Sequence, residues 1–199
     1  MTWFQRDHTG RDLRPAERKF ISALSGLLAD VAAPQIDEDE TALTAEGSDC
    51  LIVLIPHRAL GGVSIVVWLT ADGAVVTWAQ VAALDCCHDS LDLGTSVAQV
   101  RLKRADPDFS PVLECIRKQI DAPLILKRFG SDRATVLVRD HANKLREVGD
   151  IGPSVDSSEL WRRSIPSQEV VIRLTDPDPP PVTSPSGVDE WFDSGRRGV

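Results

Sequence analysis

The chain changes character near residue 175, and this change limits how much of it can fold as one body. Up to Leu174, apolar residues recur at the spacing of helices and strands. From Thr175 the sequence runs Thr-Asp-Pro-Asp-Pro-Pro-Pro and then stays polar. Proline-rich chain favours an extended spacer over a core element. We predict a flexible N-terminus over 1–13, one α+β domain over 14–174, and a disordered, acidic, Pro-rich tail over 175–199.

Composition excludes several classes of protein. Hydrophobic residues make up 42% of the chain and the mean hydropathy is −0.10, as in ordinary globular proteins. No apolar run is long enough to span a bilayer, and the charged start of the chain has no secretory h-region, so we expect a cytoplasmic protein without a membrane partner. The net charge of −8 argues against nucleic-acid binding. Arginine far outnumbers lysine, which is typical of a GC-rich bacterial genome.

The first element that the sequence predicts is a helix from about Pro15 to Val31. Proline suits the first helical turn, where its missing N–H costs nothing. Apolar residues then recur at helical spacing and form one stripe. The acidic connector from Ile36 to Thr41 follows, and we expect it to lie on the surface.

A β-hairpin is the clearest local signal. The run from Leu51 to Ile55 predicts a strand buried on both faces. Two β-rich runs, 63–70 and 74–81, follow it. Asp72-Gly73 between them suits a type I′ turn. That turn would pair Leu69 with Val76, Val67 with Trp78 and Ile65 with Gln80, and would place Trp68 and Thr77 on the opposite face.

The second half of the body alternates between strands and helices. We predict a strand near 97–103, then a helix with Ser110 as its cap and Pro111 in its first turn. A hairpin of 124–129 with 134–139 follows, and then a short helix over 141–147.

The run from Glu169 to Leu174 either adds an edge strand or docks loosely. The order of elements implies an α+β fold, in which two or three helices cover a mostly antiparallel sheet.

The segment with the most side chains suited to metal binding or catalysis is Asp85-Cys86-Cys87-His88-Asp89. Adjacent cysteines cannot easily converge on one ion, and no further Cys or His pair has metal-ligand spacing, so we expect neither a metal nor a cofactor. No serine-hydrolase motif or phosphate loop is present. The chain therefore shows no catalytic motif, and we do not expect an enzyme. The alternative is an enzyme or small-ligand sensor with a pocket near His57, Arg58, Cys87 and His88.

The leading hypothesis is a protein-binding module that acts stoichiometrically and without turnover. Acidic residues suit a basic partner, and an aromatic pair in the tail suits an interface. The candidate partner-binding residues are Asp37, Glu38, Asp39, Glu40, Asp85, Asp89, Trp191 and Phe192. Immunity proteins that neutralise toxins and secretion chaperones are compatible in size, charge and α+β layering, which is an analogy at the level of the fold.

Overall fold

The structure is a computed structural model. It describes residues 3–58, 60, 63–80, 95–103, 107–129, 133–140, 142–151 and 167–177. Two α-helices and ten strands make up the regular structure of these residues. The elements are β1 (Arg6–Asp7), α1 (Pro15–Asp30), the 3-10 helix η1 (Glu38–Glu40), β2 (Ala42–Glu46), β3 (Cys50–Pro56), β4 (Val63–Leu69), β5 (Gly73–Gln80), β6 (Thr95–Arg101), α2 (Ser110–Asp121), β7 (Leu124–Phe129), β8 (Arg133–Arg139), β9 (Leu145–Ile151) and β10 (Ser167–Ile172).

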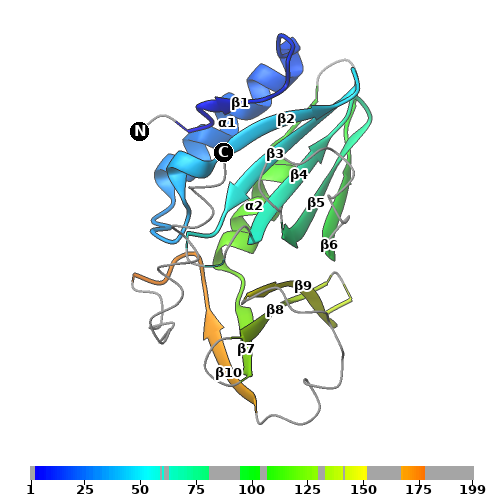
Figure 1. Cartoon of the computed structure of the whole chain (residues 1–199). Helices are drawn as coiled ribbons and strands as arrows, with labels where there is room; N and C mark the ends of the chain where they lie inside the picture. The colour runs from blue at the N-terminus through cyan, green and yellow to red at the C-terminus, as the bar shows by residue number, and fades with distance from the viewer. Residues whose placement is uncertain are drawn as a thin grey trace.

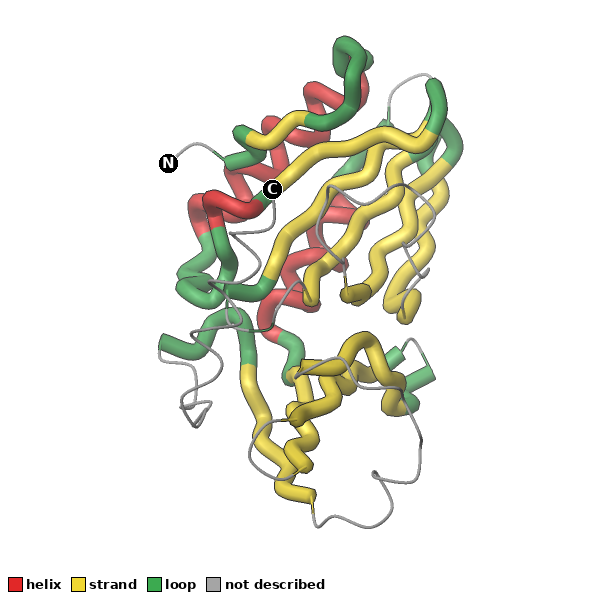
Figure 2. Tube along the Cα trace, viewed as in Figure 1, coloured by secondary structure: helices red, strands yellow, loops and turns green. Residues whose placement is uncertain are grey.

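The strands form two sheets (Figures 1 and 2). The larger sheet has six strands in the order β1-β2-β3-β4-β5-β6, and the smaller has four in the order β10-β7-β8-β9. Every pairing is antiparallel except that of β1 with β2. The α+β class and the mostly antiparallel pairing are therefore confirmed, although the strands divide between two sheets.

Both α-helices lie against one face of the larger sheet (Figure 1). Phe20 and Leu24 of α1 and Ile116 of α2 are fully buried there, in one cluster with Trp78 of β5. The Phe20 and Phe109 rings, with centroids 5.2 Å apart, join α1 to the start of α2. The apolar stripe predicted for the first helix is thus part of the surface that covers the sheet.

The opposite face of the larger sheet is apolar as well. Ile52 and Leu54 of β3 are buried there beside Val66, while Val53 and Ile55 point to the helices. The prediction that β3 is buried on both faces is therefore correct. A strand with apolar residues at every position reads as a continuous hydrophobic run.

The β4–β5 hairpin forms, but its predicted register is wrong by two residues. Leu69 pairs with Ala74, Val67 with Val76 and Ile65 with Trp78. Thr70 N donates to Gly73 O (2.9 Å), so the turn lies one residue earlier than Asp72-Gly73. Because a shift of two preserves the pleat, each side chain still takes the face we predicted.

The smaller sheet contains one strand that we predicted as a helix. Residues 145–151 form β9, which pairs with β8. The carboxylate of Asp140 accepts the backbone N–H groups of Ala142 and Lys144 (both 2.8 Å), and Asn143 has φ of 61°. This arrangement makes a tight turn, because Asp side chains stabilise turns and Asn tolerates the left-handed region.

Two further predictions in this half need correction or completion. The helix α2 begins at Ser110, whose N–H is accepted by Asp108 Oδ1 (3.0 Å), so Ser110 lies inside the helix and is not its cap. The run after residue 167 is the edge strand β10, the first of the two alternatives, and it pairs with β7. The strand predicted near 97–103 is β6.

The N-terminal segment that we expected to be flexible packs on the domain over residues 3–13. The strand β1 pairs with β2, and Phe4 is buried in the core. At the other end, Leu174 is fully buried and Gln35 Nε2 donates to Asp176 O (3.0 Å). The body therefore extends to about residue 176. From residue 178 onward the predicted tail lies outside the described residues.

Candidate functional site

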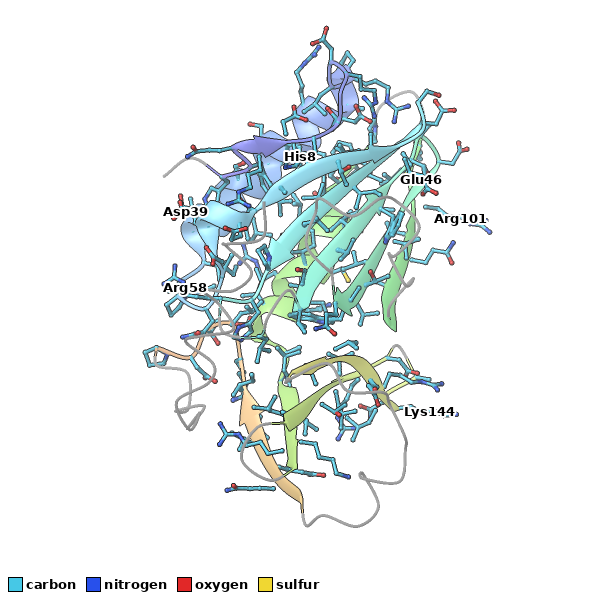
Figure 3. All side chains as sticks on the ribbon, viewed as in Figure 1. His8, Asp39, Glu46, Arg58, Arg101 and Lys144 are labelled. Carbon is cyan, nitrogen blue, oxygen red and sulfur yellow. The ribbon has the colours of Figure 1, made fainter. Side chains whose placement is uncertain are left out.

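Hydrogen bonds at both ends hold the acidic connector in place. Asp37 N donates to Pro56 O (3.0 Å), which ties the connector to the end of β3. Thr41 Oγ1 accepts from Phe4 N (2.9 Å) and donates to Glu38 O (2.7 Å). The four carboxylates of η1 and its cap thus sit on a fixed support, with Asp39 exposed at the edge of the molecule (Figure 3).

One of the four carboxylates has an ion-pair partner. Arg6 donates to Glu40 in a bidentate arrangement, with both N–O distances 2.6 Å. Both side chains are more than 40% exposed, so water and salt screen the pair and it adds little stability. Among the described residues, Asp37, Glu38 and Asp39 form no ion pair. Of these three, Asp39 is exposed, whereas Asp37 and Glu38 are half-buried.

His57 and Arg58 take different environments. His57 is 3% exposed, and burial lowers the pKa of its imidazole to about 4 although Asp176 acts in the opposite direction. The backbone N–H of His57 donates to Val63 O (2.8 Å), and the residue forms a β-bridge with Ile36. At neutral pH this imidazole is uncharged and belongs to the core.

Arg58 lies outside, at the margin of the molecule (Figure 3). Its backbone N donates to Gln35 O (2.7 Å), and its guanidinium approaches Ile36 O at 3.5 Å. The structure thus places a buried imidazole beside an exposed guanidinium. Cys87 and His88 lie outside the described residues, as do Asp85, Asp89, Trp191 and Phe192.

A cavity of about 430 Å³ lies elsewhere, between the first turn of α1, the β4–β5 turn and the chain just before α2. Its walls are largely apolar, with Leu69, Leu102 and Phe109 among them, and Lys19 also lines it. Neither His57 nor Arg58 lines this cavity. The carboxylate that borders it, Glu17, is already committed to hydrogen bonds.

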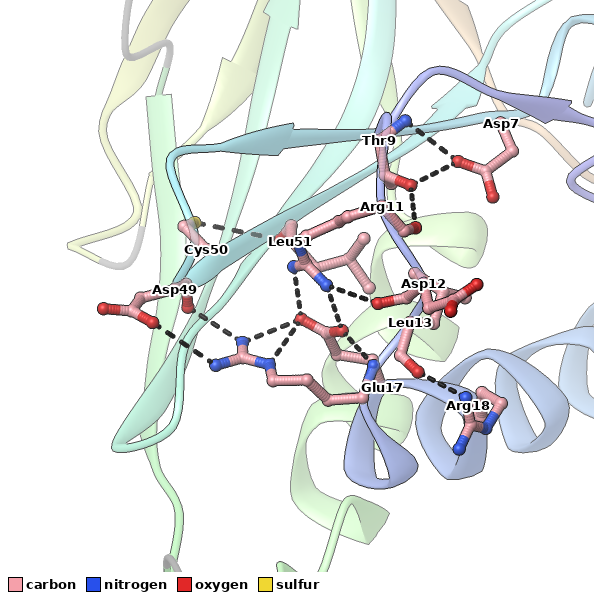
Figure 4. Close-up of polar contacts among 11 residues, drawn as sticks. Asp7, Thr9, Arg11, Asp12, Leu13, Glu17, Arg18, Asp49, Cys50 and Leu51 are labelled. Carbon is pink, nitrogen blue, oxygen red and sulfur yellow. Dashed lines mark hydrogen bonds and ion pairs between the residues drawn. The ribbon is translucent and has the colours of Figure 1, made fainter.

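Glu17 is the centre of a polar cluster that sequence reasoning missed (Figure 4). It is 2% exposed and accepts five hydrogen bonds, two from the Arg11 guanidinium and three from Arg14, one of them from its backbone N–H. Arg14 also donates to Asp49 O (2.9 Å). The spacing of Glu17 three residues after the N-cap of α1 is that of a capping box, and this was the available signal.

The cluster of Glu17, Arg11 and Arg14, which we call the clasp, has the electrostatics of a structural site. Burial alone would raise the pKa of the Glu17 carboxyl, but the hydrogen bonds from Arg11 and Arg14 outweigh burial and lower the pKa to about 2. An ionised carboxylate with both oxygens saturated cannot serve as a general acid or base near neutral pH. The cluster instead fastens the N-terminal segment and the β2–β3 turn to the start of α1.

The thiols and possible metal ligands give no reactive centre in the described part of the chain. Cys50 and Cys115 are free and half-buried, and burial raises the pKa of both thiols, so both stay protonated. Within these residues, no three His, Cys, Asp or Glu side chains are grouped so that they could hold a metal ion. Nor does the described part of the chain contain a helix of the length and apolarity that crossing a membrane requires.

Together, the fold and the site define an α+β protein with two sheets, a charged clasp at its N-terminal segment and four consecutive carboxylates at η1 and its cap. No known protein family matches the chain, and no curated protein and no solved structure is significantly similar to it.

Proposed function

We propose that this chain is a small acidic binding module of the bacterial cytoplasm, which holds another protein stoichiometrically and without turnover. The observation that supports this function is the set of carboxylates at Asp37, Glu38 and Asp39, for which the described residues provide no ion-pair partner. Their backbone is held at both ends, by Pro56 and by Thr41. Charges on a preorganised support cost less conformational entropy when a partner binds.

The chemistry of this surface selects a basic protein as the partner. Complementary charge accelerates encounter and excludes acidic competitors. Because the carboxylates lie on three consecutive residues, they suit a compact basic patch on a folded protein, such as the cleft of a toxin. This favours the immunity-protein-like version of the proposal over the secretion-chaperone-like version, in which an extended segment would bind.

The decisive experiment is a comparison of two triple variants with equal net charge. One variant carries Asp37→Asn, Glu38→Gln and Asp39→Asn. The other carries Asp30→Asn, Glu46→Gln and Asp121→Asn, which neutralise exposed carboxylates on other elements. The tagged chains are expressed in their source cells, and the captured protein is then purified for binding measurements.

We expect the chain to capture a basic protein at one-to-one stoichiometry. Neutralising the connector should weaken its affinity at least tenfold, which corresponds to about 1.4 kcal/mol. The control variant should retain the affinity, and added salt should weaken the wild-type complex. If both variants bind the partner with the affinity of the wild type, the carboxylates of the connector do not contribute to binding, and this part of the proposal is wrong.

A further inference from the structure

Among the residues that the structure describes, the strand β10 has a neighbouring strand on one side only, and it is a regular edge of the smaller sheet. It stands last in the strand order, with β7 as its neighbour, and its six-residue ladder has no bulge. The opposite edge strand, β9, pairs across an irregularity next to Val136, and the edge strand β1 of the larger sheet is two charged residues long. Short length, charge and bulges protect sheet edges from pairing with another chain, and a single acidic residue, Glu169, is the one such device in β10.

Every second residue of β10 lies on the outer face of the sheet, and the residues on this face suit pairing with a second copy of the strand. Glu169 and Val171 share this face with Arg173, which directly follows the last residue of β10, because residues of an extended chain alternate between faces. Val171 is 52% exposed, although valine is among the residue types most often found buried. It lies opposite Ile125 of β7, which lies opposite Leu137 of β8, so a partly exposed apolar row crosses three strands and ends at β10.

We propose that two copies of this chain pair antiparallel through β10, about a two-fold axis at Val171. The two four-stranded sheets then form one continuous eight-stranded sheet. The apolar row of each copy meets that of the other at the two Val171 side chains, which shield each other from water. A two-fold interface of this kind uses the same strand from both copies, so each contact occurs twice.

Charge selects this register over its neighbours. With Val171 at the axis, Glu169 lies opposite Arg173 of the partner subunit, and the same pair recurs on the other side. An axis at Val170 would place Glu169 opposite Val171 of the partner subunit. An axis at Glu169 would place the two carboxylates opposite each other, which is destabilising. The register centred on Val171 is the one of the three that pairs opposite charges.

The charged residues that face Glu169 support the same register. Lys127 of β7 lies directly opposite Glu169 within the sheet. In the dimer, Glu169 therefore lies between Lys127 and Arg173 of the partner subunit, and the charges alternate across the strands. Among the described residues, neither Glu169 nor Arg173 forms an ion pair within its own chain.

The dimer should be reversible, because the pairing is short. Arg173 N donates to Asp176 Oδ2 (2.6 Å) and Asp176 N donates to Arg173 O (3.2 Å), so the strand turns away after Arg173. Weak and transient complexes lie at the low end of the size range of specific interfaces, so we expect a weak dimer. This inference is independent of the proposed function, since it uses no residue of the acidic connector.

Sedimentation velocity of the full chain over a range of concentrations tests the dimer. The wild type should shift from monomer to dimer as concentration rises. Val171→Lys places two like charges opposite each other at the axis and should raise the dissociation constant at least tenfold. The matched control is Leu145→Lys, which changes the other strongly exposed apolar residue, 44% exposed, on the opposite edge of the same sheet. It should leave the dissociation constant unchanged.

A charge exchange tests the register. Arg173→Glu brings two pairs of carboxylates together and should weaken the dimer, whereas the double variant Glu169→Arg with Arg173→Glu restores opposite charges and should recover it. Val171→Cys should form an intermolecular disulfide under mild oxidation, since directly opposed strand residues have suitable Cα separation. The wild type and Leu145→Cys are the controls for this reaction.

Three results would overturn the inference. The first is a wild-type chain that stays monomeric at millimolar concentration, in which case the edge is left to a different protein or to another part of this chain. The second is a dimer that Val171→Lys and Leu145→Lys affect equally. The third is a failure of the charge exchange to recover a dimer that Arg173→Glu has weakened, which would place another register or another face at the interface.

Discussion

Gly73 lies directly against Val100 of the neighbouring strand. A Cβ atom at residue 73 would stand 2.7 Å from the carbonyl oxygen of Val100, closer than real Cβ atoms approach other atoms. Because the obstacle is backbone, it cannot rotate away. The start of β5 can approach β6 this closely only with glycine at this position.

Gly73→Ala should therefore destabilise the protein by about 1–3 kcal/mol, the usual range for overpacking. The matched control is Gly26→Ala in the exposed middle of α1, where a Cβ meets no atom within 4 Å. That change should stabilise the protein by about 0.5–1 kcal/mol, because alanine restricts the unfolded chain and favours helix. Denaturant unfolding of the three proteins measures both effects, and equal stability of the two variants would contradict the close approach.

Glu17→Gln should cost about 2 kcal/mol, since it leaves two arginines around a neutral side chain in a buried site. The exposed pair offers the control, because Glu40→Gln should change the stability by less than about 1 kcal/mol. Thermal unfolding at neutral pH gives the comparison.

The same carboxylate should set the acid limit of stability. Its pKa is about 2 in the folded protein and 4.5 in the unfolded chain, so its contribution is complete above about pH 4.5 and is lost as the pH falls toward 2. In Glu17→Gln this part of the pH dependence should disappear. A wild-type profile that is flat between these two pH values would contradict the clasp.

His57 should produce a separate loss of stability at milder acidity. Its pKa is about 4 in the folded protein and 6.5 in the unfolded chain, so the unfolded chain binds more protons between these values. Stability is therefore complete above about pH 6.5 and falls as the pH drops toward 4. His57→Gln should flatten the profile in this window whatever it does to the absolute stability, whereas changing the exposed His8 to Gln should not.

Gln119→Ala should destabilise the protein by about 1–3 kcal/mol, because it removes the acceptor for a buried N–H. Trp78 is fully buried in β5, and its Nε1 donates to Gln119 Oε1 of α2 (3.0 Å). Arg117→Ala on the exposed side of the same helix is the control and should change the stability by less than about 0.5 kcal/mol. Chemical denaturation followed by tryptophan fluorescence measures both.

The β4–β5 hairpin shows how much of a structure a local sequence pattern can predict. The strands and faces of β4 and β5 follow from alternation alone, and they are as predicted. Their register does not, because Gly73 serves the approach of β6 and not the turn. Since β6 is distant in sequence, no local rule reveals that demand.

The wrong helix at 141–147 has a similar cause. This segment contains good helix formers and little alternation, so propensity favoured a helix. The Asp140 side chain and the left-handed Asn143 instead fold the chain back along β8, where pairing decides the structure. Propensity is a weak guide wherever tertiary pairing is available.

For the candidate site, the sequence located the acidic connector but missed the clasp. Consecutive carboxylates can be seen directly in the sequence, whereas one partner of Glu17, Arg11, lies in the segment that we predicted to be flexible. The contact of Arg14 with Asp49 joins residues 35 positions apart, which no local pattern encodes. The pairing of β10 with β7 is non-local in the same way, and two alternatives therefore remained for that segment.

The hydrogen bond between Gln35 and Asp176 joins residues 141 positions apart. Contacts of this range close late, since a long loop must lose its entropy before the contact forms. Leu174 fills part of the common core, so the core stays open until this part of the chain arrives. During synthesis the two helices and the larger sheet would therefore emerge from the ribosome with an unfilled gap, and the final packing step would wait for the last strand of the smaller sheet.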